Sequence, residues 1–104
     1  MSEKRNSPLI DQFLDAVWLE SGLSANTLAA YRTDLKKISD WLEKRKQSLD
    51  KATKAELFDY LAHTVRSGIS ARSSARQLSS LRRFYRYLAR EGIAESDPTS
   101  DLES

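Results

Sequence analysis

The chain has 104 residues, of which 31% are charged and 39% hydrophobic, and its formal net charge is +2. This length suits one domain with a buried core, and the composition favours a folded helical protein over a disordered chain or a β-sandwich. With no cysteine and one histidine, the chain has no disulfide, no thiolate metal site and no histidine-rich metal site. No apolar run approaches the roughly 20 residues that span a bilayer. We expect a cytoplasmic protein.

The first predicted helix begins at Ser7 and Pro8, because serine is a common N-cap residue and proline is favoured at the first helical position. Residues 1–7 are polar and lack the apolar stretch of a signal peptide, so we expect a disordered lead-in there. Gly22 ends the helix. Its apolar face consists of Leu9, Ile10, Phe13, Leu14 and Val17.

The second predicted helix is capped by Ser24. It closes on the basic run 44–46, which places positive charge at the negative end of the helix dipole. Its apolar residues recur at steps of three and four: Leu28, Tyr31, Leu35, Ile38 and Leu42.

Residues 47–52 are expected to form a loop, and the third helix follows it. Thr53 and Glu56 have the spacing of a capping box, and Gly68 is the stop signal. The residues expected to face the core are Leu57, Phe58, Leu61, Ala62 and Val65.

The fourth predicted helix starts at Ser70 or a neighbour and runs to about Glu91. Asp97 and Pro98 then interrupt helical structure, and residues 99–104 read as a polar tail. The expected core face consists of Leu78, Leu81, Phe84, Tyr85 and Leu88. Four amphipathic helices joined by short loops indicate an all-α helical bundle.

Positive charge is concentrated on this fourth helix. Residues 68–92 contain six arginines and one acid, Glu91, for a net charge of +5, whereas the other 79 residues hold 11 basic and 14 acidic residues, for a net charge of −3. At about 100° per residue, one side of the helix opposite its core face carries most of this charge. That side consists of Arg72, Arg76, Ser79, Arg83, Arg86 and Arg90.

Two interpretations of this arginine face are possible. A charged helix face is usually just solvated, but such a face commonly interleaves acids for helical ion pairs, and none precedes Glu91 here. Uncompensated arginines repel one another, and a polyanion would remove that cost. The pattern therefore favours binding of duplex DNA, with Arg72 and Arg76 nearest to base edges and Arg83 against the backbone.

The outward side of the second helix carries small residues that let a DNA backbone approach closely, and the first free N–H groups of the helix favour an anion. The exposed set begins with Asn26, Ala29, Ala30 and Thr33. Thr27 and Thr33 can form hydrogen bonds with phosphate, whereas alanines on a helix exterior are otherwise simply good helix formers. No residue pattern in the chain supports covalent catalysis: the tyrosines lack a clustered base, and His63 reads as a surface histidine.

Two long blocks of the chain resemble the start of bacterial tyrosine recombinases of the Xer type. Residues 24–35 follow S-x-N-T-L-x-x-Y-R-x-D-L, and residues 73–92 follow S-x-x-R-x-L-S-x-L-R-x-F-x-x-Y-L-x-R-E-G, with Asp-Pro-Thr at 97–99. The resemblance covers nearly the whole chain, and the stretch FLDAVWLE is more similar to the XerD branch than to the XerC branch.

This resemblance implies a four-helix orthogonal bundle, the SAM-like core-binding domain, at residues 8–95, with an interdomain linker starting at 96–104. In that family the domain forms half of a clamp around DNA, and its second and fourth helices face the major groove. Matched position by position, the implied DNA-binding residues are Thr27, Ala29, Ala30, Thr33, Arg72, Ser73 and Arg76. The two alanines make only close or apolar contacts, so base specificity from the second helix stays open.

The resemblance also implies the activity of a whole recombinase, which cuts and rejoins DNA through a 3′-phosphotyrosyl link without a metal or nucleotide cofactor. Its partners would be a recombination site in double-stranded DNA, a XerC-like recombinase in a heterotetramer, and a DNA translocase of cell division. The nucleophilic tyrosine lies in a second domain that residues 1–104 do not include, so we expect no strand cleavage by this chain alone. The alternatives are a phage- or integron-type integrase and a helical module that docks an acidic protein.

Overall fold

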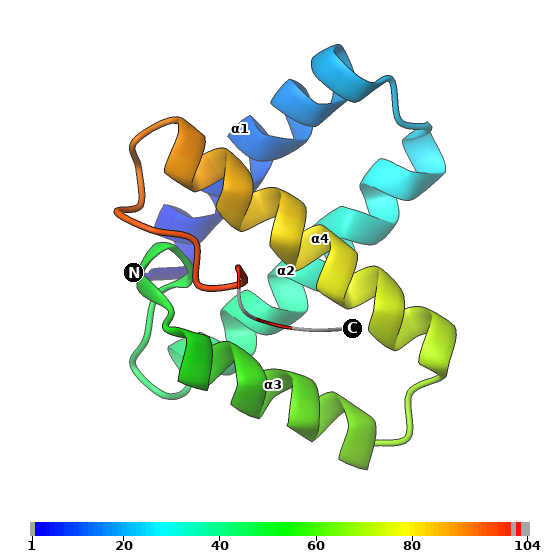
Figure 1. The fold of residues 1–104 in the computed structure, drawn as a ribbon, viewed down its shortest axis with the longest axis vertical. Coiled ribbons are helices and arrows are strands. Elements are labelled where there is room, and N and C mark those ends of the chain that lie inside the picture. Colours follow the sequence, from blue (N-terminus) through cyan, green and yellow to red (C-terminus); the bar gives the residue numbers. More distant parts are fainter. Residues whose placement is uncertain (1, 101, 103–104) are drawn as a thin grey trace.

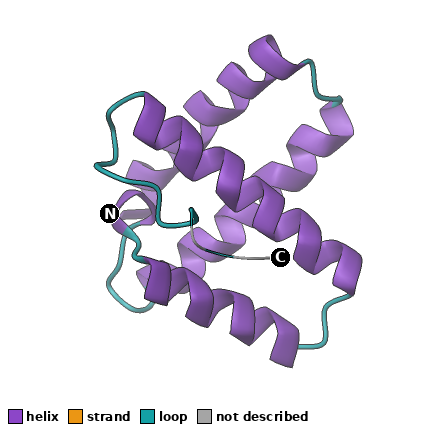
Figure 2. Ribbon diagram, in the orientation of Figure 1, coloured by secondary structure: helices purple, strands orange, loops and turns teal. Residues whose placement is uncertain are grey.

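The computed structural model describes residues 2–100 and 102, with side chains from Pro8 onwards. Its elements are α1 (Ser2–Ser21), α2 (Ala25–Glu43), the short 3-10 helix η1 (Leu49–Lys51), α3 (Lys54–Arg66) and α4 (Ala71–Arg90). In Figure 1, α4 crosses α2 near the middle of the molecule. The described residues contain helices and loops but no strand (Figure 2), which confirms the predicted all-α bundle. Among these same residues, no helix combines the length and the apolar composition that a membrane crossing requires.

Helix α1 begins earlier than its sequence signals indicate. It starts at Ser2 and contains Pro8 in its interior, so the prediction that it starts at Ser7 and Pro8 is wrong, and the backbone of residues 2–7 is helical rather than a disordered lead-in. Because proline has no amide hydrogen, Pro8 cannot donate to the carbonyl four residues earlier, and α1 continues past it without that bond. The expected apolar face is confirmed, with Ile10, Phe13, Leu14 and Val17 buried and Leu9 packed against them.

Helices α2 and α4 match their predicted N-caps and core faces. Ser24 and Ser70 are their N-cap residues, and Gly22, at the end of α1, has a φ of +61°. Lys44 is the C-cap of α2, so the basic run 44–46 follows the helix rather than forming its last turn. In α4 the five residues expected in the core are all buried, and in α2 only Leu28 of the expected stripe is partly exposed.

Helix α3 begins with the predicted capping box, but it faces the core with a different side than expected. The side chains of Phe58 and Val65 are 62% and 63% exposed, whereas Tyr60 and Thr64 are buried with Leu57. Apolar residues lie on two sides of this helix, so periodicity alone does not select one. The Thr64 hydroxyl donates to the carbonyl of Leu61 within the same helix at 2.7 Å, so it is buried with its hydrogen bond satisfied.

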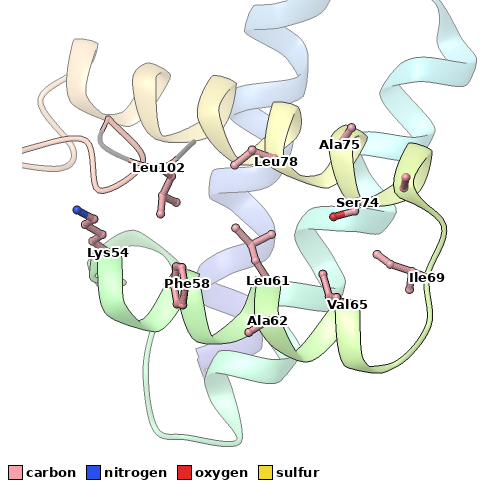
Figure 3. Close-up of a pocket in the computed structure, with 11 residues that line it drawn as sticks. Lys54, Phe58, Leu61, Ala62, Val65, Ile69, Ser74, Ala75, Leu78 and Leu102 are labelled. Carbon is pink, nitrogen blue, oxygen red and sulfur yellow. The ribbon is translucent and has the colours of Figure 1, made fainter. Parts of the chain in front are cut away.

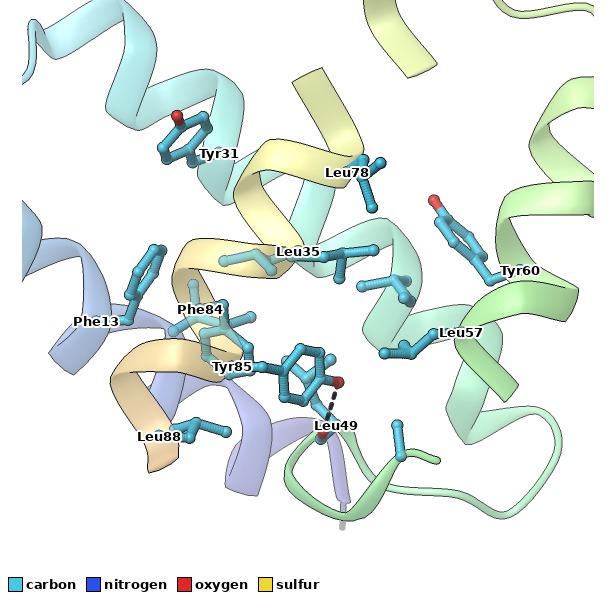
Figure 4. Close-up of a cluster of buried hydrophobic side chains, with 14 of the residues drawn as sticks. Phe13, Tyr31, Leu35, Leu49, Leu57, Tyr60, Leu78, Phe84, Tyr85 and Leu88 are labelled. Atoms are coloured by element: carbon cyan, nitrogen blue, oxygen red, sulfur yellow. Dashed lines mark hydrogen bonds between the residues drawn. The ribbon is translucent and has the colours of Figure 1, made fainter. Parts of the chain in front are cut away.

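The core is built where α1, α2 and α4 meet, and aromatic rings of α4 are central to it (Figure 4). Phe84 packs edge-on against Phe13 with ring centroids 5.4 Å apart, and against Tyr85 at 5.1 Å. Leu49 of η1, in the stretch expected to be only a loop, is fully buried in the same cluster. This stretch therefore contributes two apolar side chains to the core, Leu49 and Ala52, which follow no helical periodicity.

The segment after α4 returns to the body of the molecule. Thr99 is buried, with its amide donating to the carboxylate of Asp97 at 2.8 Å, and Leu102 is also buried. Arg82 of α4 donates a hydrogen bond to the carbonyl of Leu102. Packed residues thus extend past residue 95 into the stretch expected to be a polar tail, because Leu102 packs against the apolar core.

Candidate nucleic-acid interface

The first turns of α2 and α4 are capped in the same way. The Ser24 hydroxyl oxygen accepts from the amide of Thr27 at 3.1 Å and lies 3.0 Å from the Thr27 hydroxyl, and Ser70 makes the matching pair of bonds with Ser73, both at 3.1 Å. These bonds satisfy one orphan amide at each helix start and leave amides of the first turn for another acceptor. Both N-termini lie toward the same side of the molecule, at the right of Figure 1.

The crossing of α2 and α4 contains an ion pair between Asp34 and Arg76. The Arg76 Nε donates to Asp34 Oδ2 and its Nη2 to Oδ1, both at 3.0 Å. The Asp34 side chain is 2% exposed and the Arg76 side chain 42%. The hydrogen bonds and charge of Asp34 raise the pKa of the Arg76 guanidinium, and burial, assisted by the same charge, raises the pKa of Tyr60 to about 12.

This pair corrects one premise drawn from the arginine face. The face was expected to lack acidic partners before Glu91, but Arg76 pairs with Asp34, and Arg90 pairs with Glu20 of α1 at 2.8 and 2.9 Å. Both acids lie on other helices, so spacing within α4 does not reveal them. Arg72, Arg83 and Arg86 are exposed and have no ion pair within the part of the chain that the structure describes.

The predicted residues of the two helices lie at different distances from this crossing. The Asp34–Arg76 contact brings Arg76 to the part of α2 that holds Ala30 and Thr33, and Arg72 lies one turn earlier on α4. Ser73 lies one turn before Arg76, next to Arg72, and Thr27 lies about two turns before Asp34; the amide of each donates to the serine that caps its helix. At a rise of 1.5 Å per residue, Asp34 lies about 14 Å from the N-terminus of α2, and Arg76 lies about 8 Å from the N-terminus of α4.

Two of the predicted residues sit in settings that change their expected role. The Thr33 hydroxyl donates to the carbonyl of Ala29 at 3.1 Å, so it must give up that bond to donate to a phosphate. Arg83 lies beside α1, in a shallow recess shared with Glu20 and Arg90. Ala29 is exposed and Ala30 is partly exposed, as a close backbone approach requires.

The residue that sequence reasoning missed is Asp34. It is the one acid within the apolar stripe of α2, three residues after Tyr31 and four before Ile38, which are both buried. An acid at a core-facing helical position needs a cationic partner, because an unpaired buried carboxylate is very costly. That signal predicts a partner without identifying which arginine it is.

A second surface feature is an apolar groove of about 830 Å³ between α3 and the first half of α4 (Figure 3). Phe58, Leu61 and Val65 line it from α3, Leu78 and Ala75 from α4, and Leu102 lies at one end. Phe58 and Val65, the side chains of α3 that were wrongly expected in the core, line this groove instead. It offers apolar contact rather than charge, in contrast to the arginines of α4.

Comparison with known proteins places these features in a family context. Residues 10–92 match the family model of the phage integrase N-terminal SAM-like domain. Similar proteins include the tyrosine recombinase XerD of Yersinia pestis, 46% identical over 102 residues, and that of Pseudomonas aeruginosa, 48% identical over 96 residues. These alignments cover 98% and 92% of this chain but 34% and 32% of the relatives. The chain thus spans about a third of the length of the curated relatives it matches.

Proposed function

Since this chain belongs to the family of phage integrase N-terminal SAM-like domains, we propose that it binds duplex DNA with the face formed by α4 and the first half of α2. The observation that carries the proposal is the set of exposed arginines without acidic partners among the described residues: Arg72, Arg83 and Arg86. Three such cations along one helix attract a polyanion and release its counterions on binding.

The proposed contacts divide between the two helices. Arg72, Ser73, Arg76 and Arg83 contact the DNA from α4, while Thr27, Ala29, Ala30 and Thr33 line the approach from α2. The amides that the serine caps leave unbonded at each helix start favour a phosphate there. An α-helix fits the major groove, and the exposure of α4's arginines supports this placement.

For the whole protein we propose a site-specific tyrosine recombinase that breaks and rejoins DNA, since its relatives carry that name. Resolution of chromosome dimers at cell division, a XerC-like partner in a heterotetramer, a DNA translocase and a cytoplasmic location belong to the same proposal. Residues 1–104 supply half of the DNA clamp, with the start of an interdomain linker at 96–104. The strand-cleaving chemistry belongs to another domain of the whole protein and uses no metal or nucleotide cofactor. A phage- or integron-type integrase is the nearest alternative.

Fluorescence anisotropy with a labelled duplex at several salt concentrations tests the DNA-binding proposal. We expect steeply salt-dependent binding, and we expect Arg72→Gln to weaken it and to lower the slope of log affinity against log salt by about one, the effect of one lost phosphate contact. Arg66→Gln on α3 is the matched control, since Arg66 is exposed on another helix. Equal affinities and slopes for the two variants would show that α4 is not the contact face.

A second candidate function is the binding of another protein, and the groove between α3 and α4 is the observation that favours it. The two functions use different surfaces, so NMR separates them. Added duplex DNA at low ionic strength is expected to shift amide signals of residues 27–33 and 72–83. If those signals stay in place while a partner protein shifts Phe58 and Val65, protein binding is the function of this domain.

A further inference from the structure

The ion pair at the crossing of α2 and α4 places a buried acid behind an exposed arginine on the proposed DNA-binding face. Asp34 is almost fully buried, whereas the Arg76 side chain is 42% exposed. A carboxylate near a DNA-binding surface is repelled by the phosphates unless a neighbouring cation pairs with it. Here it neutralises that cation, so Arg76 adds little to the net charge of the face. Its contribution to DNA binding must then come from something other than charge.

The geometry of the pair fixes the direction of the guanidinium. Asp34 accepts from Nε and Nη2, which are the two donors on one side of the planar fork. The end edge of the guanidinium, formed by Nη1 and the second hydrogen of Nη2, has no hydrogen-bond partner among the described residues. Two parallel N–H groups on that edge match the O6 and N7 acceptors of guanine in the major groove. A phosphate needs no such fixed direction, since it accepts from many angles.

Resting on the DNA-binding function proposed above, we propose that Asp34 is a positioning residue for sequence readout. It holds Arg76 side-on, so that the free edge of the guanidinium contacts a guanine base rather than a phosphate. Burial shields the Asp34 carboxylate from water, and its two hydrogen bonds hold the plane of the partly exposed guanidinium. The orientation is therefore set before DNA arrives, and less side-chain entropy is lost on binding.

Arg72 provides the contrast within the same helix. It lies one turn before Arg76 and is exposed, with no acidic partner in the described part of the chain. A flexible cation of this kind strengthens binding to any duplex through the phosphates. Arg72 thus increases the affinity for any duplex, whereas Arg76, held by Asp34, discriminates between bases.

The test uses a duplex selected by this chain from a randomised pool, with each guanine replaced in turn by 7-deazaguanine. That base lacks the N7 acceptor and keeps its pairing edge. For the unmodified chain we expect one position at which the replacement weakens binding about fivefold or more. In Asp34→Asn and in Arg76→Lys this ratio is expected to fall to about one, because the normal duplex loses its N7 contact while the replaced duplex never had it.

The control and the contrary outcomes separate this inference from the DNA-binding proposal. Arg72→Gln is expected to weaken binding to both duplexes equally and to keep the ratio, and circular dichroism melts verify that each variant is folded. If Asp34→Asn weakens both duplexes equally, or if no 7-deazaguanine position affects the unmodified chain, the positioning role is wrong while DNA binding stands. If no duplex binds at low salt, both proposals fail.

Discussion

The Tyr85 hydroxyl donates a hydrogen bond of 2.6 Å to the backbone carbonyl of Leu49, which ties the second half of α4 to η1 (Figure 4). Both residues are fully buried. Tyr85→Phe removes the bond and keeps the ring, so we expect the free energy of unfolding to fall by about 1 kcal/mol. Urea denaturation measures this change. Tyr87→Phe is the control, since Tyr87 is only half-buried, and equal losses in the two variants would mean that the Tyr85 bond adds nothing.

The buried face of α3 makes a second prediction with an internal control. Leu57 is fully buried and the neighbouring Phe58 is 62% exposed. Leu57→Ala therefore creates a cavity and is expected to cost about 2–5 kcal/mol, whereas Phe58→Ala is expected to cost less than about 1 kcal/mol despite removing the larger side chain. Denaturation midpoints of the two variants decide between the faces. A larger loss for Phe58→Ala would restore the arrangement predicted from periodicity.

Local signals in the sequence predict most of this fold because they act over a few residues. Serine caps, the capping box at Thr53 and the glycine at 22 each work within one helical turn, and the apolar stripes of α2 and α4 have one clear side. Where two sides are apolar, as in α3, the choice depends on neighbours distant in sequence. Trp41 of α2, for example, packs edge-on against Tyr60 at 5.5 Å.

The arginine face of the candidate site can be predicted from local sequence, but the ion pair between Asp34 and Arg76 cannot. The excess of arginine on α4 is visible from composition, but Asp34 and Arg76 are 42 residues apart, and their pairing depends on how α2 and α4 cross. Isolated apolar residues are equally hidden. Leu49 and Leu102 have no periodic neighbours, so only the assembled surface shows that each is buried.

The packing of Leu102 predicts that the segment after α4 stabilises the domain. Its side chain is 7% exposed at the end of the apolar groove, and Arg82 donates to its carbonyl (Figure 3). Leu102→Ala is expected to lower the free energy of unfolding by about 2 kcal/mol or more, since it removes buried apolar volume. Ile93→Ala is the control, because Ile93 is 40% exposed in the preceding loop and should cost clearly less. Urea midpoints that are unchanged in Leu102→Ala would show that the segment is not packed in solution.

The pair formed by Glu20 and Arg90 predicts a specific titration. Two hydrogen bonds, of 2.8 and 2.9 Å, join the guanidinium to the carboxylate across α1 and α4. The bonds from Arg90 lower the pKa of Glu20 below its ordinary value of 4.5. A lowered folded-state pKa means that the contribution of the pair to stability is present above the unfolded-state pKa and is lost as pH falls through the folded one.

Both side chains are about half exposed, so solvent screens the pair, and unfolding measurements are a poor probe of it. The carboxyl carbon shift of Glu20, followed by NMR from pH 7 to pH 2, reports it directly. We expect its midpoint to lie below 4.5 and to rise in Arg90→Gln. Arg86→Gln removes a charge one turn earlier on α4 and should leave the midpoint nearly unchanged, because Arg86 has no ion pair among the described residues. A Glu20 midpoint that is the same with and without the Arg90 guanidinium would mean that α1 and α4 are not joined by this contact in solution.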